Sequence, residues 1–254
     1  MIKFFLLFLG ALVLSCTQND KNNSGLDGQL ENHMVRFDYL EALDKSFLFY
    51  EAQADSNPAE AGSVKRLTWT VETGLKDGKA PQYVSDDTPQ PRTINNPPNL
   101  SGGWFDGGDY VKFGLPMSYS ATMLVWSFIT SKDVYDSNFI KEYEASEIAT
   151  TAQMSIGAYG RSQIWNILNY LGRTYDDNGT EELEDDVFYY QVADGDMDHN
   201  FTGLPQEWNS YAAERGLERK AYFCDLENGC SNVAGGTAAA LASGYVLALS
   251  GISS

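Results

Sequence analysis

The chain has 254 residues, of which 43% are hydrophobic, and its formal net charge at pH 7 is −18. This charge argues against nucleic acid or an anionic membrane surface as a partner, because phosphates would be repelled rather than neutralised. A neutral polysaccharide is compatible with it. The length suffices for one domain with a sizeable core, so we expect a single folded domain.

The N-terminal segment has the organisation of an export signal. A positively charged start precedes an apolar run over residues 4–14, which is too short to span a bilayer, and a small residue then precedes Cys16. The four residues ending at Cys16 resemble a bacterial lipobox, which implies a lipid on the cysteine sulfur; plain secretion is the alternative. We expect a signal peptide over 1–16, a flexible tether over 17–34 and the domain over 35–254. The protein is then exported and held at a bacterial membrane by its lipid alone, in the periplasm or at the cell surface.

Helical periodicity opens the domain. Apolar residues recur at steps of three and four over 37–50, and again behind Pro116, which suits the first turn of a helix. Trp126 and Trp165 lie on apolar helical stripes, so we expect both to pack in the core. The prolines between 80 and 99 predict a long surface loop.

The rest of the chain continues this pattern. Helical periodicity covers 139–156, 161–174 and 232–250, whereas strand-like alternation is confined to pieces such as 187–192. These observations predict an all-α domain with long, aromatic-rich connecting loops.

Residues 102–113 carry the strongest functional signal. Asp106 and Asp109 lie three residues apart among glycines, beside the aromatic rings of Trp104 and Tyr110. Flat rings can stack on sugar faces, and an ionised Asp can take a proton from water. The alternative is a solvated turn, for which Asp and Gly are ordinary residues. A phosphate cradle is excluded, because two carboxylates would repel a phosphate and the Lys-Ser/Thr signature is missing.

Cys224 and Cys230 are close in sequence in a chain that we expect to be exported. Such a setting permits disulfides, so a small disulfide loop is predicted. Two unrelated thiols are the alternative. A zinc site is disfavoured, because no second Cys or His pair has ligand spacing.

An acidic segment precedes His199. Its aspartates at alternate positions, Asp194, Asp196 and Asp198, have the spacing of the first ligands of an EF-hand calcium loop. The later positions that require Gly and Glu hold His199 and Pro205 instead. We therefore interpret the segment as a loop of a substrate groove in which His199 donates a hydrogen bond to sugar hydroxyls; a structural histidine is the alternative.

Four segments, taken together and in order, resemble glycoside hydrolase family 9, whose endoglucanases form (α/α)6 barrels of the six-hairpin type. The segments are 37–53, 101–124, 190–199 and 231–240. Fewer helical patterns are present than the complete barrel needs. The resemblance therefore implies an incomplete (α/α)6 barrel, about the first half of the catalytic domain, and we expect a truncated gene model.

The resemblance also implies a reaction, which is hydrolysis of β-1,4-glucan with inversion. It makes Asp109 the general base and Asp106 the residue that positions water. We expect four residues to contact substrate: Trp104, Tyr110, His199 and Phe201. The family's general acid is a Glu far toward the C-terminus that is absent from this chain, so we expect little activity from the fragment. A non-catalytic surface glycan-binding lipoprotein is the main alternative, and a calcium-stabilised structural module is a third.

The resemblance implies that the chemistry requires no cofactor and that the partner of the enzyme is its β-glucan substrate. We expect a monomer when the enzyme is complete. Gly235 and Gly236 replace part of an Ala-Glu-Thr pattern of the family, which removes a carboxylate suited to calcium. Ser231 and Asn232 still offer oxygens, but they make a weak site for a hard cation, so structural calcium is doubtful.

Overall fold

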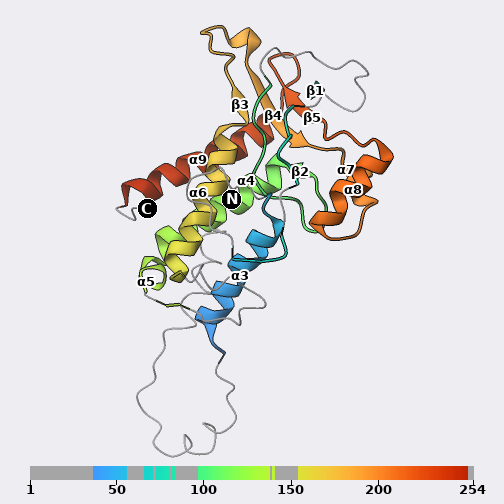
Figure 1. The fold of residues 1–254 in the computed structure, drawn as a ribbon. Helices are drawn as coiled ribbons and strands as arrows, with labels where there is room; N and C mark the ends of the chain where they lie inside the picture. The colour runs from blue at the N-terminus through green and yellow to red at the C-terminus, as the bar shows by residue number, and fades with distance from the viewer. Residues whose placement is uncertain are drawn as a thin grey trace, which may run out of the picture. The chain divides into compact units, whose positions relative to one another are not determined.

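The computed structural model describes residues 37–55, 66–70, 73–79, 82–83, 97–137, 139–140 and 154–250 (Figure 1). The predicted signal peptide, the tether and Cys16 lie outside these residues. The described residues from Leu40 onward form one compact unit. The helices are α3 (Tyr39–Gln53), α4 (Gly114–Thr130), α5 (Lys132–Tyr135), α6 (Ile156–Gly172), α7 (Gly195–His199), α8 (Pro205–Arg215) and α9 (Ser231–Leu249). The strands are β1 (Gln82–Tyr83), β2 (Lys112–Phe113), β3 (Tyr175–Asp176), β4 (Val187–Val192) and β5 (Ala221–Cys224).

Three long helices, α4, α6 and α9, build much of the core. α9 packs along α4, and α6 contacts both (Figure 1). Each buries an apolar stripe at helical spacing; on α4 it consists of Met117, Ala121, Val125 and Phe128. The approach of α9 to α6 depends on Gly244, because a Cβ there would lie 2.5 Å from Cδ1 of Leu168.

α9 is long and apolar enough to cross a membrane, judged by length and composition alone. It nevertheless packs on other helices and buries Val233, Ala240 and Leu247. Its opposite face exposes Tyr245 and Leu249. This division into a buried and an exposed face is typical of a core helix.

The all-α prediction is not confirmed, because the strands form a sheet. Its order is β1-β5-β4-β2, with β3 also pairing with β4. The pairs around β4 are antiparallel, whereas β1 and β5 are parallel. Only β4 shows alternation in the sequence. β1, β2 and β3 have two residues each, which is too short for any period, and β5 is buried at all four positions.

The predicted long elements are present apart from one. Helices occupy most of 37–50 and 161–174, the segment behind Pro116 and most of 232–250. The predicted helix over 139–156 lies largely outside the described residues, and its described ends are mostly not helical.

The prediction for Trp126 is wrong. The side chain is 46% exposed, because it lies on the face of α4 opposite the buried stripe. Trp165 is partly buried and packs against the core, as predicted.

Candidate active site

The loop that carries both predicted catalytic aspartates is fixed at its two ends by one carboxylate. Asp55 follows α3 and is 1% exposed. Its Oδ2 accepts hydrogen bonds from the Gly102 amide at 3.1 Å and from Lys112 Nζ at 2.8 Å. Its Oδ1 accepts from the Gly74 amide at 2.9 Å. A single buried side chain therefore sets where the loop begins and where it ends.

Lys112 joins this carboxylate to a wider charge network. Its Nζ also lies 2.7 Å from Asp77 Oδ2 and 3.0 Å from the Leu100 carbonyl oxygen. Arg219 binds both Asp77 oxygens, with Nε and Nη2 at 2.6 and 3.1 Å. Two cations and two carboxylates thus neutralise one another inside the protein, as buried charges require.

The pKa directions agree with this pairing. Burial raises the pKa of Asp55, but the charge of Lys112 and its hydrogen bond outweigh burial, so the pKa is lowered overall. Burial lowers the pKa of Lys112, while Asp55 and Asp77 raise it and prevail. Asp55 and Lys112 are therefore both charged at neutral pH.

The turn between the aspartates exposes their side chains. The Asp109 amide donates to the Asp106 carbonyl at 2.7 Å, and the Asp106 amide donates to the Val111 carbonyl at 2.9 Å. Gly108 has φ = 111°, a conformation that L side chains rarely adopt. Asp106 is exposed and the Asp109 side chain is 25% exposed, so both carboxylates are accessible from solvent.

His199 reaches the same place from the end of α7. Its Nδ1 lies 3.3 Å from each oxygen of Asp109, and the His199 side chain is 82% exposed. Because a carboxylate only accepts, Nδ1 carries the proton in this contact. Asp194 starts the helix by accepting from the Met197 amide at 3.0 Å, which fixes the direction of α7. The fold thus brings together two predicted site residues that are far apart in sequence.

Tyr110 and Phe201, two predicted substrate contacts, lie in a buried aromatic cluster. Tyr110 is 6% exposed, stacks on Trp208 with ring centroids 5.2 Å apart, and donates its hydroxyl to the Gly203 carbonyl at 3.1 Å. Phe201 is 8% exposed and packs against Tyr110, Trp208 and Tyr211. Burial, assisted by the charges of nearby carboxylates, raises the pKa of Tyr110 to about 12. In the structure, the two rings hold the loop at residues 102–113 against α8; their contact with sugar stays a prediction.

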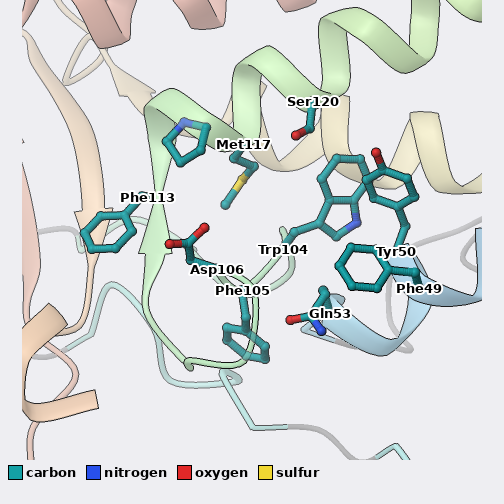
Figure 2. A pocket seen from close by; sticks show the side chains of 11 residues that line it. Phe49, Tyr50, Gln53, Trp104, Phe105, Asp106, Phe113, Met117 and Ser120 are labelled. Carbon is teal, nitrogen blue, oxygen red and sulfur yellow. The ribbon is translucent and has the colours of Figure 1, made fainter. Parts of the chain in front are cut away.

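A cavity of about 230 Å³ lies on the other side of the loop (Figure 2). Asp106 lies in it between Phe113 on one side and Trp104, Tyr50 and Phe49 on the other. Trp104, the fourth predicted substrate contact, is only 5% exposed, and its ring centroid is 4.9 Å from that of Tyr50. The cavity therefore combines one carboxylate with a largely aromatic wall, the combination that the sequence predicted for sugar binding.

The remaining predicted site residues lie around the start of α9. A disulfide joins Cys224, at the end of β5, to Cys230, with Cα atoms 5.9 Å apart. Ser231 and Asn232 occupy the exposed first turn of α9. Among the described residues, no group of three or more His, Cys, Asp or Glu side chains could hold a metal ion. The calcium prediction stays untested.

Sequence reasoning missed the residues that support the site. Asp55, Asp77 and Arg219 lie in three separate segments, and only the fold shows their ion pairs, Asp55 with Lys112 and Asp77 with Arg219. Lys112 lies inside the recognised motif. No pattern in the sequence marks it as buried, since neighbouring residues of a strand point to opposite faces; its complete burial is seen only in the fold.

Comparison with known proteins identifies the family. Residues 39–251 match the family described as glycosyl hydrolase family 9, and the chain belongs to it. Among curated relatives, "Endoglucanase A" of Bacillus pumilus is 32% identical over 221 residues, which are 87% of this chain and 26% of the relative. "Endoglucanase 2" of Oryza sativa subsp. japonica is 34% identical over 205 residues, which are 81% of this chain and 24% of the relative. The chain thus spans about a quarter of the length of these relatives.

A solved structure is also similar. The crystal structure of GH family 9 endoglucanase J30 aligns with 84% of this chain and 38% of that chain, with a TM-score of 0.43 and 17% sequence identity.

Proposed function

We propose that this chain supplies the base side of the active site of an inverting endo-β-1,4-glucanase. The observation that carries the proposal is the loop holding Asp106 and Asp109, which Asp55 fixes at both ends and which borders an aromatic cavity. The two relatives described above, both named endoglucanases, support the same reaction. We further propose that the helices belong to an (α/α)6 arrangement and that the enzyme acts as a monomer on β-glucan.

In this mechanism Asp109 takes a proton from water while the water oxygen attacks the anomeric carbon of the glucan. Asp106 accepts a hydrogen bond from the second hydrogen of the water and so directs the attack. His199 holds the Asp109 carboxylate through its Nδ1 contact. The bond from the anomeric carbon to the glycosidic oxygen breaks, and that oxygen needs a proton from a general acid. In inverting enzymes the acid lies about 6.5 to 9.5 Å from the base, across the sugar ring. We therefore assign the acid to a residue outside this loop.

A substrate whose leaving group needs no proton isolates the base side. We expect the 254-residue chain to hydrolyse β-cellobiosyl fluoride to the α-product and to turn over unactivated β-glucan poorly. Asp109→Ala should lower fluoride hydrolysis by about 10²- to 10⁴-fold, the usual contribution of general base catalysis. Asp133→Asn, an exposed acidic residue in α5, is the matched control and should leave the rate unchanged. Fluoride release and NMR of the anomeric product measure both effects.

Azide tests the role of Asp109 more directly. Azide attacks without a base. Added azide should therefore restore consumption of β-cellobiosyl fluoride by Asp109→Ala and give the α-glycosyl azide. Unchanged fluoride hydrolysis in Asp109→Ala would remove the base assignment. Rapid turnover of unactivated β-glucan by the 254-residue chain would instead contradict the proposal that these residues supply only the base side of the site.

The alternative is a surface glycan-binding protein without hydrolysis, which the aromatic cavity beside Asp106 favours. Binding of cello-oligosaccharides together with complete inertness toward the activated fluoride would support it.

In either case we propose that the protein is exported and lipid-anchored at Cys16. Fatty-acid labelling in the bacterial host should be lost in Cys16→Ala, and labelling that persists would contradict the anchor.

A further inference from the structure

α7 carries two consecutive side chains with opposite surroundings. The His199 side chain is 82% exposed and contacts the candidate base Asp109, whereas the Asp198 side chain is 2% exposed. Within the described part of the chain, neither oxygen of Asp198 has a hydrogen-bond partner. An ionised carboxylate buried without hydrogen bonds is costly, so α7 is held in this position more readily when Asp198 is neutral.

Arg219 compensates the charge of Asp198 only in part. Its Nη1 lies 3.8 Å from Asp198 Oδ2, which exceeds hydrogen-bond distance. Its Nε and Nη2 are bound to Asp77, so the guanidinium cannot turn toward Asp198 without losing those bonds. An ionised Asp198 therefore gains more from moving toward water than from staying in place.

The other ionisable groups around Asp198 do not supply the missing positive charge. They are Asp77 in the loop at residues 73–79, Asp109 and Tyr110 in the loop at residues 102–113, and Asp194 and His199 on α7 itself. The three aspartates repel an ionised Asp198.

The backbone before α7 provides a hinge. Ala193 has φ = 72°, a left-handed conformation that is strained for a residue with a Cβ, and its amide donates to the Lys220 carbonyl at 2.7 Å. α7 has only five residues, and Phe201 anchors the segment beyond it in the aromatic cluster. A displacement of this short helix can relax Ala193 while both flanks stay attached.

We propose that Asp198 is a positioning residue that acts as a pH-sensitive switch: its protonated form keeps His199 on Asp109, and loss of its proton to solvent displaces α7 and breaks that contact. Burial raises the pKa of Asp198 to about 7, so the switch operates near neutral pH. The inference rests on the proposed function only where it concerns the rate of hydrolysis.

The rate test compares the 254-residue chain with Asp198→Asn, whose neutral side chain reproduces the protonated carboxyl, on β-cellobiosyl fluoride. With a pKa of about 7, about nine-tenths of the parent carries the proton at pH 6 and about one-tenth at pH 8. At pH 6 the two proteins should have similar rates, and at pH 8 Asp198→Asn should be about tenfold faster than the parent. Asp196→Asn, an exposed aspartate of the same helix, is the control and should follow the parent.

A purely structural role gives a different result, because Asp198→Asn would then be slower than the parent at both pH values. That outcome overturns the proposal. A rate of Asp198→Asn that falls in parallel with that of the parent between pH 6 and pH 8 also overturns it, and would assign the pH dependence to another group.

NMR of the histidine ring tests the contact without catalysis. The chain has two histidines, so His33→Gln leaves His199 as the single imidazole signal. In this background Asp109→Asn should move the signal at pH 6, where the two side chains touch, and leave it in place at pH 8. With Asp198→Asn added, Asp109→Asn should move the signal at both pH values. A signal that moves at both pH values without Asp198→Asn, or at neither, overturns the proposal.

The two measurements separate this inference from the proposed function. The expected NMR pattern without fluoride hydrolysis at any pH supports the switch and contradicts the base assignment. Fluoride hydrolysis that Asp109→Ala abolishes, together with a contact that does not change with pH, supports the base assignment and overturns the switch.

Discussion

Asp55 is the residue whose contacts most directly determine the geometry of the candidate base. It accepts hydrogen bonds from Gly74 and from Gly102 and Lys112, which lie at the two ends of the aspartate loop. Lys112 is completely buried, so its charge depends on Asp55 and Asp77 for compensation. Removing either carboxylate leaves a buried cation with half of its neutralising charge.

We expect Asp55→Ala to lower the free energy of unfolding by about 3 kcal/mol or more, because breaking a buried ion pair leaves an uncompensated charge. Asp136→Ala removes an exposed ion pair with Lys132, in which both side chains are nearly half exposed, and should cost less than about 0.5 kcal/mol. Urea unfolding of both variants measures the difference. Similar losses in the two variants would show that Asp55 does not hold the loop in the manner described.

At the scale of elements, length decides what sequence reasoning finds. α3, α4, α6 and α9 have at least 15 residues each, which is long enough for apolar stripes to repeat, and all four were predicted. Strands of two residues have no period, so the sheet was missed.

The same limit applies to the site. Asp106 and Asp109 form a contiguous motif that sequence reasoning could find. The pairing of Asp77 with Arg219 arises only when β5 and the loop at residues 73–79 come together. His199 was predicted to bind substrate, and its contact with Asp109 required the structure. Local motifs are therefore visible in the sequence, whereas the buried charges that support them follow from tertiary packing.

Two helical glycines provide a matched test of packing between elements. A Cβ at Gly157 of α6 would overlap the backbone carbonyl oxygen of Tyr135 in α5, whereas a Cβ at Gly235 of α9 would meet nothing within 4 Å. Gly157→Ala should therefore destabilise the protein by about 1 to 3 kcal/mol through overpacking. Gly235→Ala should stabilise it by about 0.5 to 1 kcal/mol through helix propensity. Thermal unfolding gives both values, and changes of the same sign would contradict the close contact between α5 and α6.

On the scale of the whole molecule, buried charge links segments that are distant in sequence. Lys112 and Arg219 connect the end of α3, the loop at residues 73–79, the loop at residues 102–113 and α7 through Asp55, Asp77 and Asp198. Four of these five charges have a short contact to an opposite charge, but Asp198 has only the longer approach of Arg219. Asp198 is therefore the member of the network whose charge is least compensated.

Burial raises the pKa of Asp198 to about 7; Arg219 opposes this effect, and Asp109, Asp77 and Asp194 add to it. The unfolded chain has the ordinary Asp value of about 3.9. Because the folded-state pKa is the higher one, the folded protein binds this proton more tightly. The stabilisation is complete below about pH 4 and is lost as pH rises through about 7.

We therefore expect the free energy of unfolding of the parent to fall by about 2 to 4 kcal/mol between about pH 5 and pH 8. Asp198→Asn should remove this fall, because Asn has no proton to lose. Asp196→Asn controls for the change in net charge on the same helix, since Asp196 is exposed. Urea unfolding of the parent and both variants at several pH values measures this. The curves of the parent and Asp196→Asn should run parallel, and that of Asp198→Asn should be flatter. A parent whose stability rises over this range, or an Asp198→Asn curve parallel to that of the parent, would show that Asp198 is already ionised and fully compensated in the folded protein.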